Sequence, residues 1–298
     1  MVVNVGFIGL GQMGFYMARN LAKSGYAVTV FDINPEIREE ASRVPEFDVA
    51  RSPADVAMGV SVIFTCLPTT EAVNAVYTGT DGIAAGGSAG LVVCDCSTMA
   101  PELCRSINAA MQKVEIHYLE APILGTPLQA RDGEVFFPVS GDEIHVARVE
   151  PFLQAMGRGY LYVGETGVAN TMKILQNGLA MAHAVLSSEI LVMCERLEID
   201  TDTFIHLVKD VRGLGLSIYF ERYAEALVSG EKEQSSFLPP AVKDAHLAMD
   251  LAHDVDLPAP MLEESAAVFQ EALDRGWAAE EMTVVSRIAR SRKLSRCN

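Results

Sequence analysis

Short apolar runs rich in β-branched residues alternate with amphipathic stretches over the first half of the chain. Seven of the runs predict strands, at Val5–Ile8, Val28–Phe31, Val62–Cys66, Leu91–Asp95, Tyr118–Glu120, Val135–Ser140 and Tyr160–Val163. The stretches between them predict helices, at Met13–Lys23, Pro53–Met58, Thr70–Tyr77, Pro101–Lys113 and Glu143–Ala155. Because strands that alternate with helices form parallel sheets covered on both faces, this half predicts an α/β domain.

The pattern changes after Gly164. No strand signal follows, and a helical run extends from Val168 to Leu197, which is long for a globular helix. We interpret this run as a spine that joins two domains or two subunits. The sequence therefore predicts an α/β domain over residues 1–164 and an all-α domain over residues 165–298.

The first predicted strand runs directly into the glycine-rich loop Gly9-Leu10-Gly11-Gln12-Met13-Gly14, and a predicted helix follows. In such a loop the first glycine permits a tight turn, the second lets the backbone approach a pyrophosphate, and the third lets helix and strand pack closely. Free N–H groups and the positive end of the helix dipole then face the phosphates. This context predicts a Rossmann-type dinucleotide site, and the alternative is a glycine turn used only for packing.

An acidic residue, Asp32, ends the second predicted strand, eighteen residues beyond Gly14. A carboxylate there can accept both ribose hydroxyls of NAD, and it repels the additional phosphate of NADP. No arginine follows immediately, since the next residues are Ile33-Asn34-Pro35. The sequence therefore favours NAD over NADP.

The long predicted helix places Lys173 and Asn177 one turn apart on one face, which continues with the apolar Ala180 and Met181. Desolvation on an apolar face would lower the pKa of the lysine and make it usable as a proton donor or acceptor. Asn177 could then hold the lysine and a substrate oxygen in register. Since helix lysines are more often solvated, the residues alone leave the catalytic role open.

Several motifs follow one another along the chain in an order that is typical of one enzyme family. They are Gly6–Gly14, Cys66-Leu-Pro-Thr-Thr70, Asp95-Cys-Ser-Thr98-Met-Ala-Pro101, the helix with Gly164, Lys173 and Asn177, and the later stretch Phe237–Ala248 with its Lys243-Asp244 pair. Together they resemble the β-hydroxyacid dehydrogenases, which include 3-hydroxyisobutyrate dehydrogenases and tartronate semialdehyde reductases. The resemblance spans nearly the whole chain.

The resemblance implies an oxidoreductase that transfers a hydride between NAD(H) and a short β-hydroxyacid or its semialdehyde. It implies that Lys173 is the general acid/base, that Asn177 orients the substrate and that no metal takes part. It assigns Leu67, Pro68 and Thr98 to the ribose and nicotinamide, Lys243 to cofactor or substrate, and Ser97, Thr98 and Gly125 to the substrate carboxylate.

One departure from the family pattern concerns the substrate. After Ala121-Pro122 the family has Val-Ser-Gly-Gly, whereas this chain has Ile123-Leu124-Gly125-Thr126. The Leu124 side chain cannot form a hydrogen bond, and an unpaired polar group of the substrate would cost about 1–3 kcal/mol. We therefore expect a substrate that is less polar at this end or has its polar group held by Thr126.

Other interpretations stay open for single motifs and for the whole chain. Ser97 or Thr98 could cap the next helix, Thr69 could mark a simple helix start, and Lys243-Asp244 could be a surface ion pair. The alternative enzymes are a 6-phosphogluconate dehydrogenase relative and an imine reductase, which generally lacks the lysine. The non-enzyme alternative is a dinucleotide-binding interaction protein.

Composition narrows the partners. The net charge of −16 argues against a general nucleic-acid or anionic-membrane binder, although residues 287–298 carry five cations and no anion. We expect this basic end to rest on an acidic body or a neighbouring subunit. The six cysteines, Cys297 included, show no metal-ligand spacing and indicate reduced thiols. No signal peptide or membrane-spanning run is evident, so we expect a cytoplasmic homodimer or homotetramer acting on a small carboxylic acid.

Overall fold

The computed structural model describes residues 4–211, 215–230 and 237–292. Cys297 and the last part of the basic end therefore lie outside the described residues. The chain divides into two compact units, residues 1–173 and 174–298, which are described separately below. This division falls inside the long helix, whereas the change in sequence pattern comes at residue 164.

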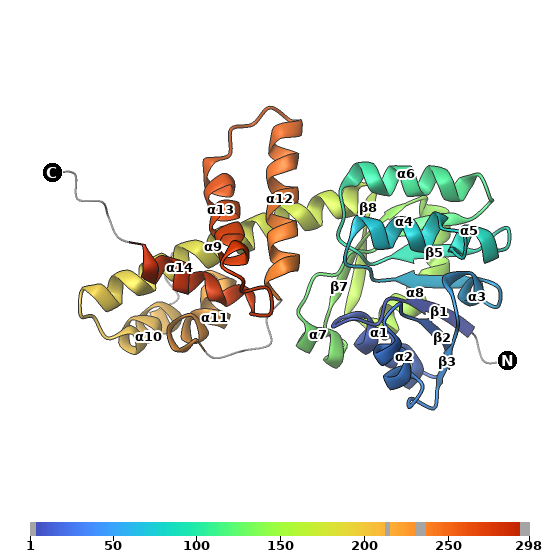
Figure 1. Cartoon of the computed structure of the whole chain (residues 1–298), viewed down its shortest axis with the longest axis horizontal. Coiled ribbons are helices and arrows are strands. Elements are labelled where there is room, and N and C mark those ends of the chain that lie inside the picture. Colours follow the sequence, from blue (N-terminus) through green and yellow to red (C-terminus); the bar gives the residue numbers. More distant parts are fainter. Residues whose placement is uncertain (1–3, 212–214, 231–236, 293–298) are drawn as a thin grey trace. The chain divides into compact units, whose positions relative to one another are not determined.

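Eight strands of the described residues form one sheet, in the order β3-β2-β1-β4-β5-β6-β7-β8 (Figure 1). The strands are β1 (Asn4–Ile8), β2 (Ala27–Phe31), β3 (Phe47–Val49), β4 (Val62–Thr65), β5 (Val92–Asp95), β6 (His117–Glu120), β7 (Phe136–Gly141) and β8 (Gly159–Gly164). The predicted α/β Rossmann-type fold is confirmed. All seven predicted strands are present, and only the three-residue β3 was missed, because so short a run shows no periodicity.

The sheet departs from the predicted parallel arrangement at one place. The strands from β3 to β6 are parallel, but β7 runs antiparallel to β6, and β8 is parallel to β7. After β6 the chain turns back early, because the N–H groups of Leu124 and Phe136 each donate to the carbonyl of the other. The intervening helix α7 (Pro127–Asp132) is a single short segment and does not carry the chain across the sheet.

Helices cover both faces of this sheet (Figure 1). Helices α1 (Gly14–Lys23) and α8 (Val146–Met156) pack on one face, around Phe7, Leu21 and Phe64. On the other face, α3 (Pro53–Ala57), α4 (Thr70–Thr78), α5 (Ile83–Gly86) and α6 (Pro101–Gln112) enclose Ile63 and Tyr77. Phe64 and Ile63 point to opposite faces because side chains alternate along a strand. The helix α2 (Pro35–Ala41) was not predicted.

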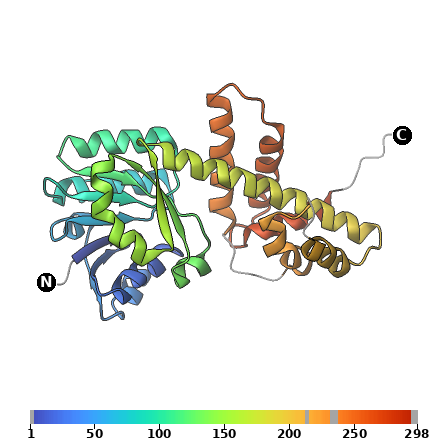
Figure 2. The ribbon, with the colours of Figure 1, turned by 180° about the vertical axis from the view of Figure 1, so that it is seen from behind.

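The second unit is helical in its described residues. Its elements are most of α9 (Val168–Arg196), then α10 (Thr201–Val211), α11 (Ile218–Ser229), α12 (Leu238–Asp254), α13 (Pro260–Asp274), η2 (Met282–Val284) and α14 (Val285–Ser291). Figure 2 shows α9 as one uninterrupted helix, as predicted. Its residues Met181 and Leu191 pack into a core with Phe220, Phe269 and Ile288.

Helix α9 is also long and apolar enough to cross a membrane, judged by length and composition alone. This corrects the expectation that no membrane-spanning run is present; the sequence shows no unbroken apolar run of that length, because polar residues such as Asn177, Ser188 and Glu189 interrupt it. Half of the most apolar window is buried inside the protein, and the core helix of a soluble protein passes the same test. The finding is weak evidence for a membrane.

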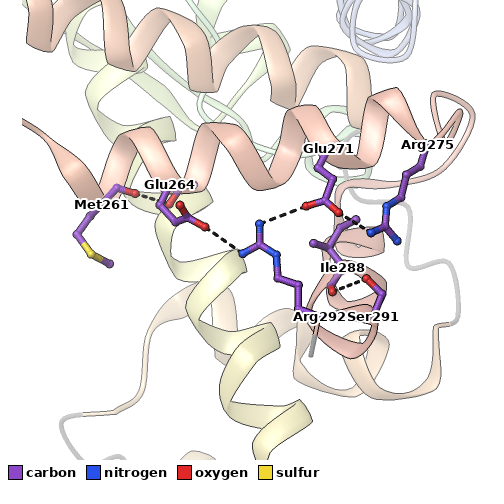
Figure 3. Close-up of polar contacts among 8 residues, drawn as sticks. Met261, Glu264, Glu271, Arg275, Ile288, Ser291 and Arg292 are labelled. Carbon is purple, nitrogen blue, oxygen red and sulfur yellow. Dashed lines mark hydrogen bonds and ion pairs between the residues drawn. The ribbon is translucent and has the colours of Figure 1, made fainter. Parts of the chain in front are cut away.

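Arginines near the C-terminus form ion pairs with acidic residues of the second unit, as expected of the basic end resting on an acidic body. Arg292 donates to Glu264 at 3.0 Å and to Glu271 at 3.2 Å, and Arg275 also donates to Glu271 (Figure 3). Arg290 pairs with Glu195 at 2.7 Å and also donates to two backbone carbonyls at the end of α11. The expectation is confirmed for the described arginines.

The turn between β1 and α1 depends on two close backbone contacts. Gly9 has φ +93°, a conformation that favours glycine, and a Cβ there would lie 2.2 Å from the carbonyl oxygen of Cys66. A Cβ on Gly14 would lie 1.9 Å from the carbonyl oxygen of Gly9. A Cβ on Gly11, in contrast, would meet no atom within 4 Å. The fold therefore requires the first and third glycines but not the second.

We predict that Gly14→Ala lowers the free energy of unfolding by more than about 2 kcal/mol, because the added methyl group overlaps backbone that cannot move freely. Gly11→Ala is the matched control and should change stability by less than about 1 kcal/mol, because its methyl group enters open space. Urea unfolding followed by circular dichroism measures both. Equal stabilities of the two variants would contradict the close contact at Gly14.

Candidate active site

The glycine loop lies at the carboxyl end of β1, and Asp32, which directly follows β2, is bonded to it. One carboxylate oxygen, Oδ2 of Asp32, accepts the N–H of Leu10 at 2.7 Å, and Oδ1 accepts the N–H of Asn34 at 2.8 Å. Asp32 thus fixes the loop in addition to any contact with a ribose. This second role was not anticipated from the sequence.

The backbone around this loop has the features that a bound dinucleotide requires. Helix α1 begins without a side-chain cap and without an acidic residue in its first turn, so its N–H groups are available to phosphates. A Cβ on Gly11 would enter open space, so the fold itself does not require a glycine at this position. An open approach to the backbone is what a bound pyrophosphate requires of the second glycine.

An arginine missed by the sequence analysis lies next to Asp32. Arg38, on α2, donates to the backbone oxygens of Asp32 at 2.6 Å and of Ile33 at 3.0 Å, and its guanidinium lies 5.7 Å from the centre of the Phe31 ring. Arg38 lies six residues after Asp32, so it does not appear among the residues that immediately follow the strand. The available signal was the Asn34-Pro35 helix start, since Asn34 caps α2 and the helix carries Arg38 back to the strand end.

Residues at the ends of β4 and β5 are joined by hydrogen bonds. The N–H of Leu67, which precedes Pro68, donates to Oγ of Ser97 at 2.8 Å, and the N–H of Ser97 donates to Oδ1 of Asp95 at 2.8 Å. Ser97 does not cap α6, because the N-cap residue is Ala100 and makes no side-chain cap bond. Thr69 does cap α4, so the simple helix start proposed for it is confirmed.

Two buried carboxyl groups lie under this edge of the sheet. Asp95 and Glu120 are register partners on β5 and β6, and both are fully buried. Burial raises the pKa of Asp95, against the effect of its bonds from Ser97. Burial also raises the pKa of Glu120, against the effect of N–H donors from Asn170 and Gly167. Neither residue was singled out from the sequence, although an acid at the end of a buried strand was a usable signal.

The segment that departs from the family pattern has its own local partners. Leu124 is partly buried and pairs through its backbone with Phe136. The Thr126 hydroxyl forms a capping box with Gln129 at the start of α7. Gly125 lies between them and is exposed. The structure thus gives Thr126 a role in the fold, beside the contact with a polar substrate group that was one of the two alternatives expected from the sequence.

The lysine and asparagine of the long helix are both on α9, four residues apart. Lys173, in the first unit, keeps 9% of its surface exposed and has polar contacts within the protein. Asn177, in the second unit, donates from Nδ2 to Oδ2 of Asp244 at 2.6 Å. Lysines are rarely so buried unless paired.

Lys243 and Asp244 lie on α12, and Nζ of Lys243 is 3.5 Å from Oδ1 of Asp244. The interpretation as a surface ion pair is wrong for Asp244, which is 8% exposed and holds Asn177. The signal for this was its position in the apolar stripe with Ala241 and Ala248. The contact of Asp244 with Asn177 was not predicted from the sequence.

The acidic, histidine and cysteine side chains do not gather into a metal site in the described part of the chain. Among the described residues, no group of three or more His, Cys, Asp or Glu side chains could hold a metal ion. The five cysteines in the described part of the chain are free thiols, and four of these are buried.

The chain is similar to known proteins in both sequence and structure. A model described as the NAD binding domain of 6-phosphogluconate dehydrogenase matches residues 4–164, and one described as the NAD-binding of NADP-dependent 3-hydroxyisobutyrate dehydrogenase matches residues 167–289. The chain is 31% identical to the probable mitochondrial 3-hydroxyisobutyrate dehydrogenase of Arabidopsis thaliana, covering 95% of this chain and 86% of the relative. It is 29% identical to the 3-sulfolactaldehyde reductase of Escherichia coli strain K12, covering 94% of each.

A solved structure agrees with these matches. The chain superposes on the 3-hydroxyisobutyrate dehydrogenase of Salmonella typhimurium with a TM-score of 0.85 and 27% identity, over 96% of this chain and 99% of that one. The relatives are named as dehydrogenases and reductases, and both halves of the chain match models of nicotinamide-dinucleotide enzymes. The chain therefore belongs to the β-hydroxyacid dehydrogenase family, a family of oxidoreductases that use a nicotinamide dinucleotide.

Proposed function

We propose that the protein is an NAD-dependent dehydrogenase of a short β-hydroxyacid, or the reverse semialdehyde reductase, with Lys173 as general acid/base. The observation that carries the proposal is the burial of Lys173 near the start of α9, with only 9% of its surface exposed. A surface lysine would keep its ammonium group in water. A buried amine that exchanges a proton with a substrate oxygen accounts for its place in the fold.

In the proposed oxidation, the Lys173 amine accepts the hydroxyl proton of the substrate, and in the reduction it returns the proton to the carbonyl oxygen. A bound nicotinamide dinucleotide supplies the hydride acceptor or donor. Asn177 would orient the substrate oxygen. Because Nδ2 of Asn177 donates to Asp244, its carbonyl oxygen is left to accept a hydrogen bond from a hydroxyl group. Lys243, beside Asp244, would contact the cofactor or the substrate.

For the cofactor we propose NAD over NADP. Asp32 lies after β2 and places a carboxylate where an additional phosphate would be repelled. The model that matches the second unit is named for an NADP-dependent enzyme, and Arg38 places a cation beside Asp32, so the two charges oppose each other here. The Arg38 guanidinium is engaged by two backbone oxygens and the Phe31 ring, which favours the carboxylate as the deciding group.

For the substrate we propose an acid that is less polar than tartronate semialdehyde at the end near Leu124. Leu124 offers no side-chain hydrogen bond, and the neighbouring hydroxyl of Thr126 serves the capping box of α7. The relatives named above act on 3-hydroxyisobutyrate and 3-sulfolactaldehyde by name, and both compounds belong in the substrate panel. A clear preference for tartronate semialdehyde would contradict this proposal.

We further propose that the protein assembles as a homodimer or a larger homo-oligomer through α9. Met172, Leu179, Leu186 and Met193 recur every seventh residue along this helix, and each is about half exposed or more. They form a stripe about 30 Å long, with the spacing typical of contacts between helices. A second copy of the chain would bury this stripe, and the net charge of −16 disfavours an anionic bilayer as the alternative.

We predict that Lys173→Ala lowers kcat by at least about a hundredfold with the best substrate of the panel, because the step loses its acid/base. Lys173→Arg should also be impaired, since arginine does not deprotonate in proteins. The control Lys113→Ala changes an exposed lysine and should leave kcat unchanged. NADH affinity and circular dichroism confirm that the fold is intact. If Lys173→Ala keeps its rate under those conditions, the acid/base role is wrong.

We predict that Asp32→Asn raises the ratio of kcat/KM with NADP to kcat/KM with NAD by at least about tenfold, because the repelling charge is removed while one acceptor oxygen remains. Replacing Arg38 by Ala in addition should reverse part of that gain. The control Asp48→Asn changes an exposed carboxylate on β3 and should leave the ratio unchanged. A wild-type enzyme that already prefers NADP would refute the assignment.

We predict that wild type elutes with a mass at least twice its 32.2 kDa in light scattering, and that Leu179→Glu with Leu186→Glu lowers this mass, because two buried charges oppose association. Leu207→Glu on α10 is the control, since this exposed leucine lies off the stripe. A monomeric wild type would overturn the proposal. It would also be overturned if the wild type co-sedimented with neutral lipid vesicles and the double variant did not.

A further inference from the structure

The start of α9 is held by a side chain from another element. Oε1 of Glu120 accepts the N–H of Gly167, and Oε2 accepts the N–H of Asn170 at 3.3 Å. Oγ of Ser140, on β7, accepts the N–H of Ala169 at 3.1 Å. Since Gly167 has no side chain, α9 cannot supply its own cap. Glu120 and Ser140 replace it and satisfy first-turn N–H groups that would otherwise be unpaired.

Glu120 does more than cap the helix, because it also fixes the side chain of Asn170. Nδ2 of Asn170 donates to Oε2 of Glu120 at 3.0 Å, and Oδ1 of Asn170 accepts the N–H of Met99 at 3.0 Å. Both side chains are fully buried. With its NH₂ group bound to a carboxyl group, the amide can turn only its oxygen toward Met99. Glu120, together with Sγ of Cys104, which also accepts from Nδ2 at 3.4 Å, therefore determines which atom of Asn170 faces the loop.

The loop reached in this way carries residues assigned to the substrate and cofactor. Met99 directly follows Ser97 and Thr98, and Ser97 is itself held by Asp95 and accepts the N–H of Leu67. On the helix side, Lys173 lies three residues after Asn170, one turn further along the same ridge. The chain Glu120–Asn170–Met99 thus joins the turn of α9 that precedes Lys173 to the loop of Ser97 and Thr98.

We propose that Glu120 and Asn170 are a positioning pair that sets the Lys173 amine in register with the Ser97–Met99 loop. The inference rests on the acid/base role proposed for Lys173. A rotation or shift of the first turn of α9 moves Lys173 against the loop, and an error of about 1 Å at a reacting group lowers rates by about a hundredfold. Neither Glu120 nor Asn170 exchanges a proton with the substrate in this proposal.

The test compares variants that remove different parts of this connection. Glu120→Gln keeps the length of the side chain but places an NH₂ group against N–H donors. Asn170→Ser keeps a small polar side chain but no longer reaches both Glu120 and Met99. Ser140→Ala is the matched control, because it removes a cap of the same helix turn without touching Asn170 or the loop. If the fully buried Glu120 variant does not fold, Asn170→Ser carries the test.

The first readout is turnover by folded enzyme with the panel compound of highest kcat/KM. We expect Glu120→Gln and Asn170→Ser to lower kcat by at least about tenfold while KM and NADH affinity change less than about threefold, because the binding groups stay in place. Ser140→Ala should lower stability but not kcat. Equal kcat in all three variants and wild type would show that Glu120 is only a cap, and the positioning role would be wrong.

The second readout does not need turnover. Hydrogen–deuterium exchange should become faster in the Met99 loop as well as in the start of α9 for Asn170→Ser, whereas Ser140→Ala should affect only the start of α9. Unchanged exchange in the Met99 loop would overturn the proposed connection.

A variant pair separates this inference from the proposed function. On a Lys173→Ala background, Asn170→Ser should lower the residual rate by less than about twofold, since a residue that acts through the lysine has nothing further to remove. If Lys173→Ala keeps full activity, the acid/base proposal fails. If Lys173→Ala is inactive and Asn170→Ser keeps wild-type kcat, the acid/base role stands and the positioning role fails.

Discussion

The hydrogen bonds from the N–H groups of Gly167 and Asn170 to the Glu120 carboxyl group are the constraint on which the start of α9, with the proposed acid/base Lys173, depends. They join the end of β6 to the first turn of the longest helix. Without them α9 would begin with unpaired buried N–H groups, which cost about 1–3 kcal/mol each. The first turn of α9, which precedes Lys173, is therefore fixed to the sheet.

Keeping two acids buried at this edge has a free-energy cost that the N–H donors offset. Burial raises the pKa of both Asp95 and Glu120, so each is less stable as a charged group than it would be in water. Each also accepts backbone N–H groups, and these favour the charged form. A fully hydrogen-bonded buried network of this kind favours one arrangement of the chain, because any other arrangement would leave its polar groups without partners. Here that arrangement orients the loop of Ser97 and Thr98.

Asp32 lies after β2, on the other side of β1 and β4 from Asp95 and Glu120. Its side chain can stabilise the fold and contact a ligand at the same time. Its two oxygens hold the N–H groups of Leu10 and Asn34, and each oxygen retains a lone pair for a hydroxyl group. Substitutions at Asp32 therefore act on the glycine loop as well as on cofactor choice. Arg38 adds a positive charge close by, so the preference between NAD and NADP depends on the balance of two neighbouring charges.

The sequence by itself determined most elements of the sheet domain and the cofactor loop. Seven strands, the long helix and the glycine loop could be predicted, because apolar periodicity and backbone geometry are local properties. The tight contact at Gly14 lies within the same local turn, since a Cβ there would meet the carbonyl oxygen of Gly9. The family resemblance added Lys173 and Asn177 as candidates.

Only the tertiary structure decided the partners of the buried polar groups. Glu120 and Asn170 are fifty residues apart, and Asn177 and Asp244 are sixty-seven apart, so no local signal connects them. The antiparallel turn at Leu124 and the return of Arg38 to Asp32 likewise depend on contacts outside each element. Periodicity predicts that a residue is buried, but the hydrogen-bond partner of a buried polar group is set by which strand end the fold places beside it.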